Sequence, residues 1–134
     1  MSKIVHISGK RKRAIARATL RDGNGIIRIN KMLLDCYGNK LARMRIIEPL
    51  MIAEEIAGKV DISVNVHGGG WQSQAEASRL AIARALVEYS RGDKLKRAFL
   101  DYDRHLLVAD TRFNEACKPN DSGKPRKKRQ KSYR

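Results

Sequence analysis

The chain has 134 residues, enough for one domain with a small core. It carries 29 Lys and Arg against 14 Asp and Glu, a net charge of +15, and such an excess needs a polyanionic partner. No apolar run approaches the roughly 20 residues that span a bilayer, and the start lacks the apolar stretch of a secretory signal. We therefore expect a cytoplasmic protein that binds nucleic acid and not a membrane.

Cysteine and histidine are too scattered for a metal site. Cys36 and Cys117 lie far apart, and His6, His67 and His105 are equally separate. A structural zinc site needs four ligands, usually in close pairs. The motifs GxSxG and HExxH and a Cys/His dyad are absent from the sequence. We expect no cofactor and no enzymatic activity.

Two paired strands are predicted first, over roughly 3–21 and 25–30. The stretch DGNG between them is typical of a hairpin turn, and the following GIIRIN is rich in β-branched residues. Alternation along the first strand separates its two faces. The apolar face consists of Ala14, Ala16, Ala18 and Leu20, and the charged face of Arg13, Arg17 and Arg21.

A basic cluster overlaps the charged face of that strand. Its members are Lys10, Arg11, Lys12, Arg13, Arg17 and Arg21, and the first five are selected as candidate contacts. Arginines spaced four apart are also typical of a solvated outer face, which is the alternative to a binding role. The adjoining run of four cations favours a strip that contacts the phosphates of RNA. These five residues are therefore candidates for RNA binding.

The middle of the chain predicts helices and one strand. The stretch KLARMRIIEPLMIAEEIAG has apolar residues at helical spacing, and Pro49 divides it into two short helices that end at Gly58. Met44 and Met51 belong to the apolar positions and are expected in the core. The segment VDISVNVH, residues 60–67, alternates strictly and predicts a half-buried strand.

Three glycines, Gly68, Gly69 and Gly70, connect that strand to the helix predicted over 71–90. Backbone N–H groups and the helix dipole at such a junction favour a phosphate. Neither GxGxxG nor GxxxxGK[ST] is present, which argues against a nucleotide pocket. We assign the three glycines to RNA phosphate binding, and a purely structural tight turn is the alternative.

Two helices are predicted in the second half, over 71–90 and 93–104, followed by a short extended stretch, LLVADTR. The first helix offers two intrahelical ion pairs, Glu76–Arg79 and Arg84–Glu88. Asp101 and Asp103 are two positions apart, so on a helix they do not face each other. They are therefore no candidate pair for acid–base catalysis.

The last 17 residues, 118–134, differ from the rest in composition, with eight Lys and Arg against one Asp. They also contain Pro and Gly and only one large apolar side chain. Such a segment cannot bury enough surface to offset its ordering entropy, so we expect it to be disordered when free. The chain thus divides into one α/β domain, 1–117, and a basic tail. Its candidate ribosomal RNA contacts are Lys124, Arg126, Lys127, Lys128 and Arg129.

Three stretches together resemble a known family. They are GKRKRAIARATLRDGNGIIRIN at 9–30, VHGGGWQSQAEASRLAIARAL at 66–86 and KPRKKRQKSYR at 124–134. The chain resembles the universal uS9 family, the ninth protein of the small ribosomal subunit, over nearly its whole length. The ending KSYR is similar to the archaeal and eukaryotic branch.

The resemblance implies an α+β fold, a four-stranded mixed sheet with helices packed on one face. It also implies a split β-α-β unit with a left-handed crossover, against the usual hand, and an extended basic C-terminal tail. The body would sit in the head of the small subunit, against ribosomal RNA and neighbouring head proteins. In that setting the protein would be a structural constituent that recognises RNA by shape and backbone.

The resemblance further implies that the tail threads through ribosomal RNA to the anticodon stem-loop of the peptidyl-site tRNA. The candidate tRNA-binding residues are Arg134, Tyr133, Ser132 and Lys131. Arg134 matches the family's terminal arginine, the expected phosphate contact. Tyr133 stands where bacterial members carry lysine, so a stacking or hydrogen-bonding contact replaces a charged one. Lys131 also continues the basic run of Lys128 and Arg129 that neutralises ribosomal RNA.

Two other functions are compatible with the residues alone. A free-standing RNA- or DNA-binding protein, such as an RNA chaperone, would use the tail as a non-specific anchor. An enzyme would use the glycine turn to hold a nucleotide phosphate. The first alternative predicts that the order of the tail residues is unimportant, and the second that a nucleotide raises the melting temperature.

Overall fold

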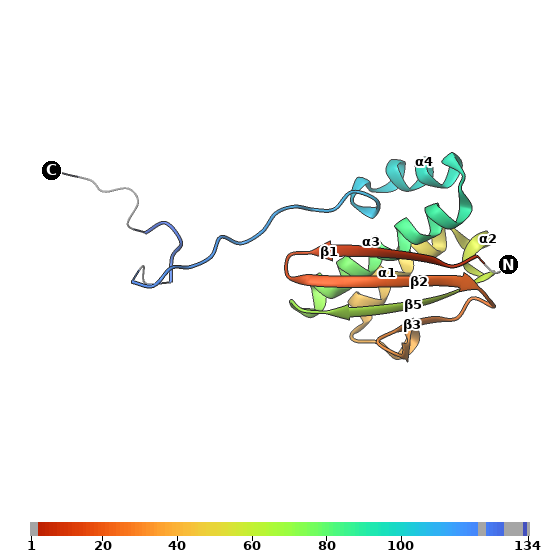
Figure 1. The fold of residues 1–134 in the computed structure, drawn as a ribbon, viewed down its shortest axis with the longest axis horizontal. Helices are drawn as coiled ribbons and strands as arrows, with labels where there is room; N and C mark the ends of the chain where they lie inside the picture. Colours follow the sequence, from red (N-terminus) through yellow and green to blue (C-terminus); the bar gives the residue numbers. More distant parts are fainter. Residues whose placement is uncertain (1–2, 121–122, 128–132, 134) are drawn as a thin grey trace.

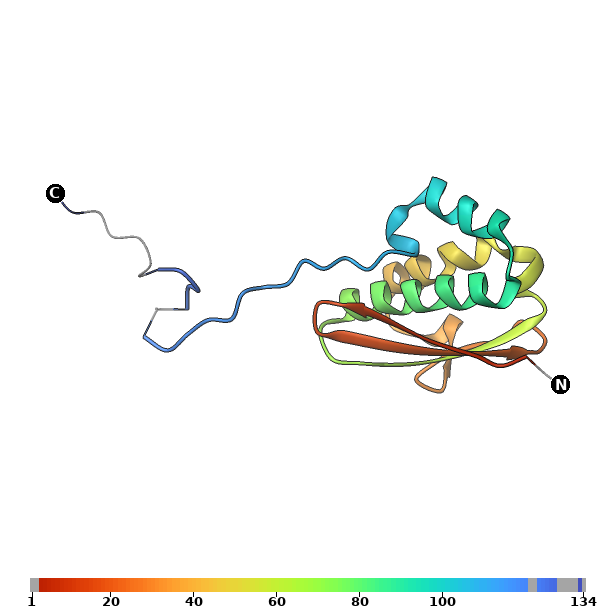
Figure 2. The same ribbon diagram turned by 45° about the horizontal axis from the view of Figure 1, so that its top comes forward.

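The computed structural model describes residues 3–120, 123–127 and 133. Its strands build one mixed sheet in the order β1-β2-β5-β3-β4, and its helices lie on one face of that sheet (Figure 1, Figure 2). The strands are β1 (Val5–Arg11), β2 (Ala14–Asp22), β3 (Ile27–Ile29), β4 (Met32–Leu33) and β5 (Val60–His67). The helices are α1 (Lys40–Ile52), α2 (Glu54–Ala57), α3 (Trp71–Ser90) and α4 (Asp93–Tyr102), with 3-10 turns η1 (Leu34–Cys36) and η2 (Arg104–Leu106).

The single strand predicted over 3–21 is wrong, because the chain reverses inside it. β1 and β2 form an antiparallel hairpin in which Arg11 pairs with Ala14, and Lys12 adopts a left-handed conformation with φ of 51°. Arg13 therefore lies in the turn and not on the strand face. The apolar face predicted for 14–20 is confirmed, since its four residues are fully buried.

The predicted pairing of 25–30 with the preceding strand is also wrong, because β5 lies between β2 and β3. The Asp61 carboxylate, in β5, accepts backbone hydrogen bonds from Asn24 and Ile26, each 2.9 Å long. These bonds, led by the one from Ile26, lower the pKa of Asp61. They carry the loop across the end of β5, so β3 pairs with β5 in parallel instead of forming a hairpin.

The sheet has five strands and not the four that the resemblance implied. The additional strand is β4, two residues that pair antiparallel with β3 across a turn at Asn30 and Lys31, both at positive φ. The β-α-β unit is not split either, because the parallel strands β3 and β5 are immediate neighbours. The left hand of the crossover stays a prediction.

The core is made by β2, β5 and α3, which pack closely because so many of their facing residues are small. Val60, Ile62, Val64 and Val66 are buried as the alternation of 60–67 predicted. The closest approach of sheet and helix is at Gly9, where an added Cβ would lie 2.4 Å from the Ala77 carbonyl oxygen. Glycine is therefore required at this position of β1 by the distance to α3.

The predicted break at Pro49 is wrong, because α1 runs through it and ends three residues later. A proline inside a helix removes one backbone hydrogen bond and strains the preceding turn. Here the Pro49 carbonyl still accepts the N–H of Ala53, at 3.2 Å, and the proline ring is buried in the core. The disruption is thus confined to the last turn of α1.

The prediction that Met44 and Met51 lie in the core is wrong. Their exposed fractions are 55% and 71%, and Leu41 on the same side of α1 is 65% exposed. The buried face of α1 is formed by Ala42, Ile46, Pro49 and Leu50. The exposed residues are three and seven positions apart, so they form a stripe on the outward side of the helix.

The chain leaves the body after η2. Leu106 is fully buried, whereas Phe113 is 58% exposed, and Figure 1 shows this segment running away from the sheet at the end opposite to the N-terminus. The division into a domain 1–117 and a tail 118–134 stays a prediction. None of the helices among the described residues is long and apolar enough to cross a membrane.

Candidate nucleic-acid interface

One end of the body gathers the cations that the sequence singled out. The β1–β2 turn and the glycine turn between β5 and α3 lie side by side there (Figure 1, Figure 2). Lys10, Lys12 and Arg13 are exposed on the hairpin. An added Cβ at Gly68 would lie only 2.5 Å from the Arg13 carbonyl oxygen, which places the two turns in contact.

The three glycines differ in what their positions require. Gly68 and Gly69 have φ of 77° and 65°, a conformation that disfavours other residues, and their contact with RNA phosphate stays a prediction. Gly70 has an ordinary φ of −97°, and no described atom lies within 4 Å of the position that a Cβ would take there. Within the described part of the chain no side chain caps α3, so its first N–H groups stay open to a ligand.

A groove of about 590 Å³ lies beside these N–H groups. Lys12, Arg13 and Gly70 line one wall, and the segment Phe113–Cys117 lines the other. Glu115 is the single acidic residue among the described lining residues. Two cations and the positive end of a 20-residue helix therefore face the same space, an arrangement that favours a phosphate group.

The open face of the sheet carries further cations, two of which sequence reasoning did not select. Arg17 lies on this face opposite Asn65 of β5, as the alternation predicted. Arg21 and Arg28, from β2 and β3, line a groove of about 630 Å³ together with Ser63 and Asn65. Arg28 could not be added from the sequence alone, because its place beside β5 depends on the parallel pairing of β3.

Arg11 behaves differently from its neighbours in the basic cluster. Its guanidinium contacts Glu76 at 2.7 Å and Asp110 at 3.3 Å, and it donates to the Arg112 carbonyl at 3.2 Å. Its side chain is only 15% exposed. Two carboxylates thus neutralise Arg11, and a direct contact of this residue with RNA stays a prediction.

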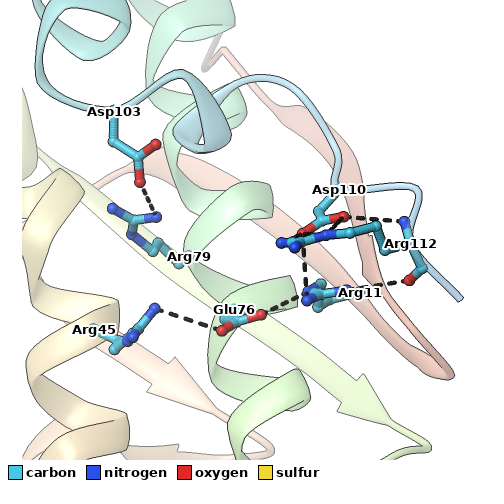
Figure 3. Close-up of polar contacts among 7 residues, drawn as sticks. All are labelled: Arg11, Arg45, Glu76, Arg79, Asp103, Asp110 and Arg112. Carbon is cyan, nitrogen blue, oxygen red and sulfur yellow. Dashed lines mark hydrogen bonds and ion pairs between the residues drawn. The ribbon is translucent and has the colours of Figure 1, made fainter.

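Arg11 is part of an ion-pair network that holds the root of the tail against the body, and a separate group of ion pairs is centred on Arg79 (Figure 3). Arg79 of α3, 9% exposed, pairs with Glu48 of α1 at 2.5 Å and with Asp103 at 2.9 Å. Arg45 adds a contact of 3.5 Å to Glu76. The predicted intrahelical partners of Glu76 and Arg79 are therefore replaced by partners on other elements.

The pKa values of two aspartates in these ion pairs, Asp103 and Asp110, are lowered. Burial alone would raise the pKa of Asp103, but the N–H of His105 and the Arg79 guanidinium outweigh it and lower that pKa. Hydrogen bonds from the Arg112 side chain lower the pKa of Asp110 far below its ordinary value. Asp103 is thus an ion-pair partner of Arg79.

The tail is described only in part. Lys124, Arg126 and Lys127 are at least partly exposed, and Arg126 contacts Glu115 at 2.6 Å. Tyr133 is 86% exposed. The other candidates of the tail, Lys128, Arg129, Lys131, Ser132 and Arg134, lie outside the described residues.

The described residues offer no cluster of three or more His, Cys, Asp or Glu side chains that could hold a metal ion. Cys36 and Cys117 are free thiols and exposed. What the arrangement can do chemically is bind anions at a cationic, uncapped end and along an open polar sheet face. Among the described residues that line the groove on this face, none is aromatic.

Comparison with known proteins relates this arrangement to a family. The family model described as Ribosomal protein S9/S16 matches residues 9–134 of the chain. The chain is 50% identical over 133 residues to the small ribosomal subunit protein uS9 of Methanococcus vannielii, covering 98% of this chain and 99% of the relative. It is 49% identical, with the same coverage, to proteins of that name from two strains of Methanococcus maripaludis.

Proposed function

Because the chain belongs to the ribosomal protein S9/S16 family, we propose that it is a structural constituent of the small ribosomal subunit that binds ribosomal RNA and neighbouring ribosomal proteins. The family predicted from the sequence is thereby confirmed, and the Methanococcus relatives agree with the predicted branch. A place in the head of the subunit, in the cytoplasm, and a role without catalysis belong to the same proposal.

The observation that carries the RNA-binding role is the meeting of the β1–β2 turn with the uncapped start of α3. Exposed cations and free backbone N–H groups face one groove there, and both bind phosphate without reading base identity. The proposed ribosomal RNA contacts of the body are Lys10, Arg11, Lys12, Arg13, Arg17, Gly68, Gly69 and Gly70. Arg21 and Arg28 extend this set across the open sheet face.

The proposed contacts of the tail with ribosomal RNA are Lys124, Arg126, Lys127, Lys128 and Arg129. Pairing of the eight tail cations with phosphates would give a log–log salt slope of about −6 to −7, and half of that if some stay solvated. Removal of residues 118–134 should therefore reduce the measured slope of ribosomal RNA binding by at least about 3. An unchanged slope would contradict this role of the tail.

At its tip the tail contacts the peptidyl-site tRNA through Arg134, Tyr133, Ser132 and Lys131. The test is tRNA affinity for the peptidyl site of small subunits whose copy of the protein stops at Cys117. Weaker tRNA binding in fully assembled subunits supports the contact. Unchanged binding means that the tail serves ribosomal RNA alone. Deletion of Arg134 by itself should cost about 1–3 kcal/mol of tRNA binding, the value of one charge-assisted contact.

The rival function is a free-standing protein that binds RNA or DNA non-specifically. It predicts that the protein binds unrelated RNA as tightly as ribosomal RNA and that a scrambled tail works as well as the native order. Competition between small-subunit ribosomal RNA and an unrelated RNA of equal length separates the two functions. Equal competition would favour the rival.

A further inference from the structure

The end of the body opposite to the β1–β2 turn has a different surface. A groove of about 420 Å³ lies there between the last turn of α1, α2 and the first half of α4. Met51, Ile56 and Leu95 are among its apolar lining residues. We call this surface the α2–α4 groove.

The α2–α4 groove continues into an exposed apolar stripe on α1. Met51 belongs to both, and the stripe extends along the helix through Met44 and Leu41. Each of these three side chains is more than half exposed. Contiguous exposed apolar surface of this kind marks a contact with another macromolecule, whereas single exposed apolar residues need no explanation.

The residues that line the α2–α4 groove have a net negative charge, opposite in sign to that of the whole chain. Its charged lining residues are Glu54 and Glu55 against Lys94, although the chain as a whole carries +15. Both glutamates are exposed, and neither takes part in an ion pair between described residues. Carboxylates next to apolar side chains repel phosphate and attract ammonium and guanidinium groups.

We propose that the α2–α4 groove is the docking site for a Lys- and Arg-rich segment of another small-subunit protein, with apolar side chains that enter the groove. This inference rests on the proposed ribosomal role. Apolar contacts with Met51, Ile56 and Leu95 supply affinity, and Glu54 and Glu55 select a cationic partner. RNA does not fit, because it has no apolar side chains and carries the wrong charge. The chain's own tail leaves the body at the other end (Figure 1).

The test uses assembled small subunits that carry a photo-crosslinker in this protein. Met51→p-benzoylphenylalanine reports on the groove, and Ser63→p-benzoylphenylalanine, on the open sheet face, reports on the proposed RNA surface. Both positions are exposed, so the substitutions leave the core intact. Mass spectrometry then identifies the crosslinked molecule and segment.

We expect the probe at 51 to crosslink a Lys- and Arg-rich protein segment and the probe at 63 to crosslink ribosomal RNA. Crosslinks from 51 to RNA, to residues 113–134 of this chain or to a second copy would overturn the inference, as would no crosslink while the probe at 63 succeeds. Failure of the probe at 63 to reach RNA would instead count against the proposed function.

A second experiment tests the two glutamates. The partner protein that the crosslink identifies is then studied in subunits without a crosslinker. Glu54→Lys with Glu55→Lys should speed its salt-induced release from the subunit about 2- to 30-fold, as expected for the loss of two exposed ion pairs. The matched control is Asp35→Lys, an exposed carboxylate in η1 outside the groove. Release at the wild-type rate in the double variant, or equal acceleration in the control, would contradict the role of Glu54 and Glu55.

Discussion

The hairpin end and the α2–α4 end of the body share one core but differ in what they expose. At the hairpin end, Lys12 and Arg13 lie beside uncapped N–H groups of α3. At the opposite end, Glu54 and Glu55 flank a groove lined by apolar side chains. The comparison teaches that the net charge of +15 is not shared equally by the two ends. In the proposed ribosomal role, the protein needs a surface that accepts protein as well as one that binds RNA.

The largest expected effect is a loss of RNA affinity when the charge of the hairpin end alone is reversed. Arg13→Glu with Arg17→Glu should weaken binding to small-subunit ribosomal RNA by about 3 kcal/mol or more, because two charge-assisted contacts become repulsive. The salt slope should fall by about 2. Filter binding at several salt concentrations measures both quantities.

The matched control for that variant is Lys59→Glu with Lys94→Glu, an identical change of charge near the α2–α4 groove. If the comparison between the ends is correct, this control binds RNA almost like the wild type at moderate salt. Equal losses in the two double variants would mean that RNA senses only the total charge.

The next prediction concerns the stability of the core that both ends share. Gly9→Ala should destabilise the isolated protein by about 1–3 kcal/mol, because its Cβ would meet the Ala77 carbonyl oxygen at 2.4 Å. Denaturant unfolding checks the value, with Gly70→Ala as a control that has open space around it. A Gly9→Ala protein as stable as the wild type would mean that the helix and sheet separate at little cost.

A smaller effect concerns the ion pair between Asp103 and Arg79. Asp103→Asn should cost about 1–2 kcal/mol at pH 7, since Arg79 loses a partner and the carboxylate is only partly buried. The folded-state pKa of Asp103 is lowered, so its contribution is complete above the unfolded pKa and disappears as the pH falls through the folded pKa. The difference in melting temperature between the two proteins should thus begin to shrink as the pH falls below about 3.8; a constant difference down to pH 2 would exclude this ion pair as the cause.

The smallest effect is expected for a substitution at the hairpin end that should change folding stability and RNA affinity in opposite directions. Gly70→Asp should stabilise the isolated protein by about 0.5–1 kcal/mol by capping α3, and it should weaken RNA binding by placing a carboxylate at the phosphate site. Gly70→Ser is the matched control, because it caps without charge. Equal RNA affinity of the Asp and Ser variants would show that no phosphate lies there.

Much of the fold could be predicted because it depends on neighbouring residues. The buried faces of 14–20 and 60–66 follow from alternation, and α3 follows from its length and apolar spacing. The turn at Lys12 could not be predicted, because neither Lys nor Arg is a turn former and the alternation continues beyond it. The partner of β3 depends on Asp61, which lies more than thirty positions from the loop it holds.

The candidate site was predictable in its charge and not in its geometry. The basic cluster was visible as a run of cations, but the separate role of Arg11 depends on Glu76 and Asp110, which are distant in sequence. Met44 and Met51 were assigned to the core because α1 is apolar on more than one side. Which side is buried depends on where α3 lies, and helical spacing alone does not contain that information.

The ion pairs at the tail root have a consequence for the local concentration of the tip. Asp110 and the Arg112 carbonyl are held by Arg11, so the 24 residues after Asp110 are attached to the body at this point. Their full reach is roughly 80 Å. A ligand tethered within such a radius acts at an effective concentration of about a millimolar. In the proposed ribosomal role, a contact of the tip with tRNA would therefore be occupied most of the time if its dissociation constant is below about a millimolar.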